Sequence, residues 1–216
     1  MLYIYSGEVP ELDEVLRADL GEEHVFTVIP CGPHEIGAAK YMADCFRYHG
    51  IRARVLGTRY YKDRHRLRRI IMGSDGIFLM GGNTFEFLNY AKDIDLFKVL
   101  ADYEEEGGLI AAESAGSIIL SKRIDTAWVP SCHPDENTIG LTDFEGMGRL
   151  PFHISPHFDP ESETSNQDRR ELQQLANETD LKVVVLHDGD GLIINEQIIT
   201  AQFGSPFELD PENVLE

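Results

Sequence analysis

Positive charge is scarce in this 216-residue sequence, which has 19 Lys and Arg residues against 38 Asp and Glu residues. The formal net charge of −19 at pH 7 disfavours nucleic acid and anionic membranes as partners, because both repel an acidic surface. The simplest explanation of this balance is a solvated acidic surface, which a high-salt habitat would favour.

Basic residues gather in one stretch only, RYYKDRHRLRRI, at residues 59–70. Aromatic and basic residues interleave there, a pattern that can indicate RNA binding. We favour a helix that pairs with acidic neighbours, or a contact between subunits, because the rest of the chain is so acidic.

Long apolar runs and a basic leader are also missing. No run of 18 or more apolar residues occurs, so we expect no transmembrane helix. The first residues, MLYIYSGEVPELDEV, turn acidic at once, which argues against a signal peptide.

Cysteine is sparse, and metal-binding patterns are lacking. Cys31, Cys45 and Cys132 show no CxxC spacing, which predicts reduced thiols in a cytoplasm and argues against structural zinc. His153 and His157 are four residues apart, but the proline at 156 makes a metal-binding helix there improbable. We therefore expect neither a metal nor an organic cofactor.

Short apolar runs alternate with longer helix-like stretches along the chain. The predicted strands are Leu2–Tyr5, Val25–Pro30, Arg52–Leu56, Gly76–Met80, Leu109–Ala112, Phe152–Ser155, Val183–Leu186 and Leu192–Ile194. The predicted helices are Glu11–Leu16, His34–His49, Thr84–Asn89, about Leu96–Glu106, Gly116–Leu120 and Gln167–Glu178. This alternation predicts an α/β fold with a mostly parallel sheet and helices on both faces.

The length fits one domain spanning residues 1–216. Residues 204–216, GSPFELDPENVLE, are expected to form a loosely packed tail. The segment from Arg123 to Gly148 has weak periodicity and is expected to be a long loop with short pieces of structure. Functional sites in such sheets lie at the carboxyl ends of the strands, so we expect reactive side chains at those positions.

A polar serine interrupts an apolar stretch in AAESAGSIIL, residues 111–120. Ser114 follows a predicted buried strand and precedes small residues, Ala115 and Gly116, that allow a sharp turn into a helix. Such a nucleophile elbow exposes the hydroxyl at the edge of the sheet, above helix N–H groups. The usual GxSxG pattern is reduced here to AxSxG, so a helix N-cap serine is the alternative.

A nucleophilic serine needs a base, an orienting acid and donors for the oxyanion. FHISPHFDPE places His157 after a predicted strand, and VVVLHDGDGLII places Asp188 and Asp190 after another. GIFLMGGNTFEFL ends a further strand with Gly81-Gly82-Asn83, where a backbone N–H can be exposed. Each group also has a structural explanation: a surface or core histidine, an Asp-Gly turn, or a strand-to-helix turn. Together they would meet in one cleft, in the chain order Ser, His, Asp.

The segments GGNTF, ESAG, SPHF and LHDGDG, in this order and spacing, resemble the peptidase E (aspartyl dipeptidase) family of serine peptidases. Cyanophycinase is a related branch, and the resemblance covers about residues 28–196. It implies a three-layer α/β sandwich of flavodoxin-like architecture, similar to class I glutamine amidotransferases, with serine replacing their cysteine. It also implies Ser114 as nucleophile, His157 as general base, and Gly82 and Ala115 as backbone donors to the oxyanion.

The chain departs from the family pattern near the nucleophile and at the third triad position. The family usually has a glutamate in a PEG-like turn, where this chain has His187-Asp188-Gly189. Asp188 is therefore the expected orienting acid, and Asp190 is the fallback. Ala112 replaces a glycine often found before the elbow, and Glu113 stands where an apolar or neutral residue is usual.

The resemblance also bears on substrate preference. The family holds the substrate's aspartate with an arginine that follows a threonine shortly after the PHF histidine. The matching stretch here is TSNQDRREL, in which Ser165 follows Thr164. Arg169 or Arg170 could substitute, but as helix residues they are expected to face elsewhere. We therefore expect substrate binding by Asn83, Glu113 and Ser165, without strict specificity for Asp-X dipeptides.

By resemblance, the chain is expected to be a cytoplasmic serine peptidase that hydrolyses short peptides. The alternatives are a cyanophycinase-like peptidase or other acyl hydrolase, or a non-catalytic member of the fold that binds a ligand or peptide, with Ser114 as a structural cap. The expected partner is a short peptide substrate, with neither nucleic acid nor membrane, and a homodimer is left open.

Overall fold

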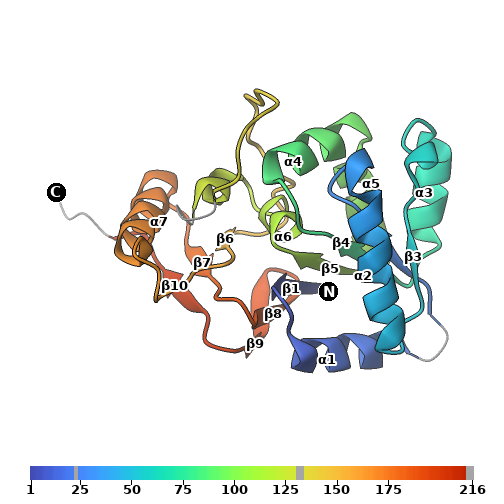
Figure 1. Ribbon diagram of the computed structural model, residues 1–216, viewed down its shortest axis with the longest axis horizontal. Helices are drawn as coiled ribbons and strands as arrows, with labels where there is room; N and C mark the ends of the chain where they lie inside the picture. The colour runs from blue at the N-terminus through green and yellow to red at the C-terminus, as the bar shows by residue number, and fades with distance from the viewer. Residues whose placement is uncertain (22–23, 130–133, 213–216) are drawn as a thin grey trace.

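The computed structural model describes residues 1–21, 24–129 and 134–212, so Cys132 lies outside the described residues. Within these residues, a seven-stranded sheet has the order β3-β2-β4-β5-β1-β8-β9, and a three-stranded sheet has the order β10-β7-β6 (Figure 1). The strands are β1 Leu2–Ser6, β2 Phe26–Ile29, β3 Ala53–Val55, β4 Gly76–Leu79, β5 Leu109–Glu113, β6 His153–Ser155, β7 Val183–Val185, β8 Asp190–Asn195, β9 Ile198–Phe203 and β10 Phe207–Leu209.

The large sheet is parallel through most of its width. Strands β3, β2, β4, β5 and β1 pair in parallel, and β8 and β9 add antiparallel strands at one edge. In the small sheet, β6 and β7 are parallel and β10 is antiparallel to β7. The predicted α/β fold with a mostly parallel sheet is confirmed, with one correction: the second sheet and the strands β9 and β10 were not expected.

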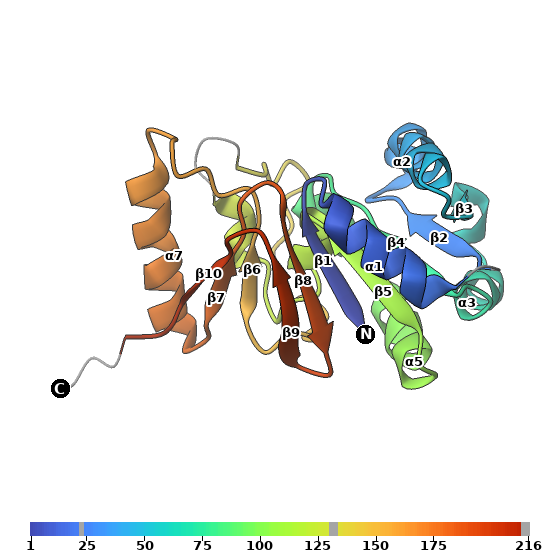
Figure 2. The same ribbon diagram turned by 90° about the horizontal axis from the view of Figure 1, so that it is seen from below.

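Helices cover both faces of the large sheet. The helices are α1 Pro10–Leu20, α2 Ile36–Tyr48, α3 Arg64–Met72, α4 Thr84–Asp93, α5 Leu96–Glu105, α6 Ala115–Ile118 and α7 Ser165–Thr179, with 3₁₀ turns η1 Pro33–Glu35, η2 Thr58–Tyr60 and η3 Asp125–Trp128. Helices α1 and α2 pack on one face, and α3, α4, α5 and α6 pack on the other. Helix α7 lies against the small sheet, at the opposite end of the molecule from α3 (Figure 2).

Strand β1 shows how the sequence places its side chains in two cores. Leu2 and Ile4 lie in the core beneath α3–α6, while Tyr3 and Tyr5 lie in the core beneath α1 and α2. Successive side chains of a strand point to opposite faces, so a run that is apolar at every position is buried on both sides. This explains why the parallel strands are continuous apolar runs without alternation.

The basic stretch at 59–70 forms most of helix α3, as expected. Arg64 pairs with Asp95 at the start of α5, and Arg68 pairs with Asp102 within α5. Asp63 caps the helix by accepting a hydrogen bond from the backbone N–H of Arg66 at 3.0 Å. The interpretation of a helix that pairs with acidic neighbours is therefore confirmed.

The sequence predicts two irregular segments, residues 123–148 and the C-terminal tail from residue 204, and both contain some regular structure. Residues 123–148 contain η3 and an isolated bridge between Arg123 and Glu145, as expected of a long loop with short pieces of structure. In the expected tail, residues 207–209 form β10 and pair with β7, so this part of the segment is held by the small sheet. In the described chain, no helix has the length and apolar character needed to cross a membrane.

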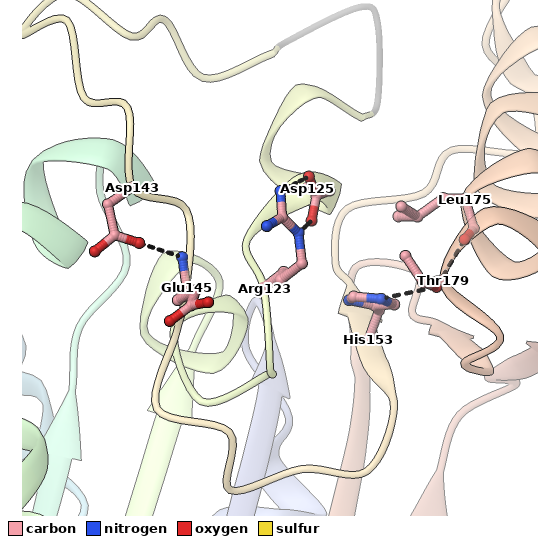
Figure 3. Close-up of polar contacts among 7 residues, drawn as sticks. All are labelled: Arg123, Asp125, Asp143, Glu145, His153, Leu175 and Thr179. Carbon is pink, nitrogen blue, oxygen red and sulfur yellow. Dashed lines mark hydrogen bonds and ion pairs between the residues drawn. The ribbon is translucent and has the colours of Figure 1, made fainter.

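A buried histidine joins the small sheet to helix α7. His153 begins β6, is fully buried, and its Nε2 lies 3.2 Å from the hydroxyl of Thr179 (Figure 3). That hydroxyl donates to the carbonyl of Leu175 at 2.7 Å, so it accepts from a His153 that carries its proton on Nε2. Nδ1 has no hydrogen-bond partner among the described residues. Burial lowers the pKa of His153, partly offset by the backbone of Arg123.

The lowered pKa predicts a loss of stability in mild acid. The folded protein keeps His153 neutral, whereas the unfolded chain takes up a proton near the ordinary histidine pKa of about 6.5. The contribution of neutral His153 to the free energy of unfolding is therefore fully present above about pH 6.5. It is lost as the pH falls toward the lowered pKa of His153 in the folded protein. Urea unfolding between pH 8 and pH 5 should show a steeper loss in the wild type than in His153→Phe. Equal slopes in the two proteins would contradict this account.

Candidate active site

Ser114 occupies a strained turn between β5 and α6. Its backbone has φ of +50° and ψ of −120°, a conformation that is uncommon for a residue other than glycine. The turn is tight, since a Cβ on Gly116 would lie 2.3 Å from the carbonyl oxygen of Leu79. The Ser114 side chain makes no capping hydrogen bond to α6, which speaks against the N-cap alternative. The hydroxyl is thus held at the carboxyl end of β5 without a structural partner in the helix.

Three side chains form a row at this edge. Nε2 of His157 lies 2.8 Å from Oγ of Ser114, and Nδ1 of His157 lies 2.6 Å from Oδ1 of Asp188. A carboxylate only accepts hydrogen bonds, so Nδ1 carries a proton, and a neutral ring then accepts from Ser114 at Nε2. This is the tautomer in which an imidazole can remove the proton of a serine hydroxyl.

The backbone of His157 is fixed by the end of strand β1. His157 has φ of +62°, and its N–H donates to Oγ of the buried Ser6 at 3.0 Å. The carbonyl of Ser6 accepts the N–H of Gly189 at 2.7 Å, next to Asp188. Ser6 therefore contacts both loops that carry the histidine and the aspartate. No feature of the Ser6 sequence context pointed to this role, because its partners lie far along the chain.

Asp190, the alternative candidate for the acid that orients His157, contacts other residues. It is 3% exposed, and its Oδ2 lies 2.8 Å from both N and Nδ1 of His187. Its Oδ1 accepts the N–H of Ser205 at 2.8 Å. Asp190 therefore closes the turn after β7, and Asp188 faces His157.

Two backbone amides lie near the serine hydroxyl. Gly82 has φ of +137°, and a Cβ there would lie 2.8 Å from Cβ of Cys31, so this position requires glycine. A Cβ on the preceding Gly81 would lie 3.2 Å from Cβ of Ser114, which places this loop against Ser114. The other amide is that of Ala115, the first residue of α6. Among the described residues, neither N–H donates to a backbone carbonyl, so both can donate to an oxyanion.

Cys31 was not singled out from the sequence as part of this site. Its thiol donates to the carbonyl of Asn83 at 3.1 Å, and it packs under Gly82. Burial, followed by the charges of Glu86, Glu35 and other carboxylates, raises the pKa of the Cys31 thiol to about 12. The protonated thiol thus supports the Gly82 loop, and only its place after β2 could have suggested a position at this sheet edge.

The residues expected to bind substrate have other contacts in this structure. Asn83 caps α4 by accepting from the N–H of Glu86 at 3.1 Å, and its amide donates to the carbonyl of Glu136 at 2.9 Å. Ser165 is the first residue of α7 and, among the described residues, makes no hydrogen bond to the row of Ser114, His157 and Asp188.

Arg169 and Glu113 also have other surroundings. The guanidinium of Arg169 lies 4.9 Å from the ring centre of Phe207, as expected for a residue that faces elsewhere. The side chain of Glu113 lines a cavity beside α1 and α2. Burial raises the pKa of Glu113, with His157 and the backbone of Gly81 acting in the opposite direction.

Comparison with known proteins places this chain in a family. Residues 11–201 match the model described as Peptidase family S51. Peptidase E of Shewanella amazonensis is 36% identical over 91 residues, which are 42% of this chain and 36% of that protein. Peptidase E of Salmonella arizonae is 31% identical over 128 residues, which are 56% of this chain and 52% of that protein. The chain therefore spans between a third and about half of the length of these curated relatives.

Solved structures resemble the chain over nearly its whole length. A candidate peptidase E protein from Listeria monocytogenes EGD-e has a TM-score of 0.72 at 20% identity, covering 94% of this chain and 98% of that one. A peptidase from an acI-B1 actinobacterium has a TM-score of 0.66 at 15% identity, covering 97% and 93%. At these identities the likeness shows the fold alone, and it confirms the flavodoxin-like, class I glutamine amidotransferase-like architecture.

The different environments of the two aspartates predict different consequences of mutation. Asp188→Asn should slow acylation of Ser114 by up to about 10⁴-fold, because an amide favours the wrong histidine tautomer, and should leave the melting temperature unchanged. Asp190→Asn should instead lower the free energy of unfolding by about 1–3 kcal/mol, because buried donors lose an acceptor. Labelling rates with a fluorophosphonate, and urea unfolding, measure the two effects. The reverse ranking of labelling rates would move the orienting role to Asp190.

Proposed function

Because this chain belongs to peptidase family S51, we propose that it is a serine peptidase that hydrolyses short peptides through Ser114, His157 and Asp188. The observation that carries this proposal is the continuous row from Oγ of Ser114 through His157 to Asp188, with separations of 2.8 Å and 2.6 Å. The sequence match to peptidase E proteins supports the same class of substrate.

In the proposed mechanism, Ser114 attacks the scissile carbonyl while Nε2 of His157 takes the hydroxyl proton. Asp188 keeps the proton on Nδ1 and stabilises the imidazolium that forms. The backbone N–H groups of Gly82 and Ala115 donate to the tetrahedral oxyanion. His157 then protonates the leaving amine, and water releases the acyl group from Ser114. In this last step His157 takes a proton from the attacking water and gives it to the leaving Oγ of Ser114, so each proton transfer passes through His157.

A cytoplasmic location belongs to the same proposal. Cys31 and Cys45 are free thiols, and structural disulfides are uncommon in reducing compartments. A short, unmodified peptide is the substrate that such a compartment supplies from protein turnover.

The proposed specificity is broader than Asp-X. Ser165 stands where the family pattern places the arginine that holds a substrate aspartate, and Arg169 stacks on Phe207. The nearest carboxylate in sequence to the nucleophile is Glu113, which disfavours an acidic substrate side chain. We therefore propose neutral or basic residues at the substrate's N-terminus.

Replacing the nucleophile tests the reaction class. Ser114→Ala should lower kcat by about three to six orders of magnitude, because the attacking oxygen is removed, and the protein should stay folded. Peptide turnover and fluorophosphonate labelling are the measurements, with Ser205→Ala, an exposed serine, as the matched control. Near-normal turnover in Ser114→Ala would refute the nucleophile assignment, and an unfolded variant would return Ser114 to a structural role.

A dipeptide series tests the specificity. A charge-assisted hydrogen bond to a substrate carboxylate contributes about 1.5–3 kcal/mol, so its absence removes roughly 10- to 150-fold of preference for aspartate. We expect kcat/KM to be low for Asp-Leu and higher for Ala-Leu and Lys-Leu. An aspartate preference above about 100-fold, or one that disappears in Arg169→Ala, would show that another arginine holds the substrate.

A further inference from the structure

A cavity of about 340 Å³ opens beside the candidate active site, between α1, α2 and the ends of β1 and β5. Its volume lies within the usual range for small-molecule sites, about 300–1,000 Å³. Its charged lining is mostly acidic: Glu8, Asp13, Glu14 and Glu113 face Arg17 and His49. Phe46, Phe78 and the ring of Tyr5 supply apolar walls.

The hydroxyl of Tyr5 is a buried polar group in this lining, with the carboxylate of Asp13 nearby. The side chain of Tyr5 is 4% exposed, and within the described residues its hydroxyl has no partner of hydrogen-bond geometry. Burial, together with the nearby carboxylate of Asp13, raises the pKa of this hydroxyl, so it stays protonated and polar. The hydroxyl of Tyr5 and the carboxylate of Asp13 are thus neighbours, and together they offer adjacent polar groups to a ligand that bridges them.

Two of the carboxylates are partly removed from water. Burial raises the pKa of Asp13 and the pKa of Glu113. A buried carboxylate is costly unless it is paired, and an incoming cation would supply the missing charge. The aromatic walls add attraction for an ammonium or guanidinium group, whereas a hard metal ion prefers a shell of oxygen atoms.

The cavity shares its wall with the reacting groups. Glu113 is bonded directly to Ser114, and a Cβ on Gly7 would lie 3.6 Å from Oδ1 of Asp188. In a dipeptide, the N-terminal residue forms the acyl group that Ser114 attacks. Its side chain and its α-ammonium group are therefore the parts of the substrate that start nearest to this cavity.

We propose that this cavity binds an organic cation, the ammonium or guanidinium group of the substrate's N-terminal residue, through Asp13, Glu113 and Tyr5. This inference rests on the proposed function, and it names the substrate class that the site prefers. The residues that select the substrate then lie on the α1–α2 side of the large sheet. They do not belong to α7, the helix that carries Ser165.

The kinetic test compares substrates that differ only in charge. Lys-Leu and norleucyl-Leu report on a side-chain cation, and Ala-Leu and N-acetyl-Ala-Leu report on the α-ammonium group. We expect kcat/KM to favour the charged member of at least one pair by about 10- to 150-fold. Asp13→Asn should reduce that preference at least tenfold. As a control, Glu11→Gln removes a carboxylate from the exposed face of α1 and should leave the charge preference unchanged.

A direct binding test keeps this inference separate from the proposed function. Lysinamide is titrated calorimetrically into Ser114→Ala and into the double variant Ser114→Ala, Tyr5→Phe, in which only the hydroxyl of the cavity is removed. We expect binding to the first protein and weaker binding to the second. Binding of lysinamide without turnover of any peptide would overturn the proposed function alone. The cation site alone would be overturned by turnover that shows no charge preference, together with two further results. These are no binding of lysinamide at millimolar concentration, and equal kinetics of Asp13→Asn and Glu11→Gln.

Discussion

Ser6 connects the two sheets of this protein through hydrogen bonds to the loops that carry His157 and Asp188. Its hydroxyl accepts the N–H of His157 at 3.0 Å, and its carbonyl accepts the N–H of Gly189 at 2.7 Å. The serine and the amides for the oxyanion come from the large sheet, while His157 and Asp188 follow strands of the small one. The spacing between the two halves of the row therefore depends on the last residue of β1. Because Ser6 is buried, water does not compete for these bonds.

Close backbone packing positions the part of the site that comes from the large sheet, namely Ser114 and the amides of Gly82 and Ala115. Gly116 and Gly82 each lie where a Cβ would collide with a neighbour, the carbonyl of Leu79 in one case and Cys31 in the other. The contact of Gly116 joins the carboxyl ends of β5 and β4, and the contact of Gly82 joins those of β4 and β2, as the parallel pairing of these strands makes possible. The strained backbone of Ser114 is thus held in place by packing on both sides.

Much of this arrangement could be predicted from the sequence, because apolar runs and small-residue turns are local signals. The strands of the parallel sheet and the positions of Ser114, His157 and Asp188 after them belong to this group. The choice between Asp188 and Asp190 depends on contacts with His157 and Ser205, and two aspartates in one turn look alike in sequence. Strand β9 alternates exposed and half-buried positions at a sheet edge, so it lacked the apolar run that marked the buried strands. The role of Ser6 could not be predicted, since its partner His157 is 151 residues away.

Asp188 has one further property with consequences for the chemistry. Its side chain is 74% exposed, whereas Asp190 nearby is buried. Water and dissolved ions weaken the field of an exposed carboxylate, so its attraction for a positively charged imidazole is worth far less than it would be in a dry interior. The hydrogen bond of 2.6 Å between Asp188 and His157 still orients the imidazole ring in the presence of water. In the proposed mechanism Asp188 thus acts as a guide for the histidine more than as its counter-charge. The amides of Gly82 and Ala115 act on the opposite charge, the developing oxyanion, and their dipoles do not depend on salt or on the protonation of any side chain.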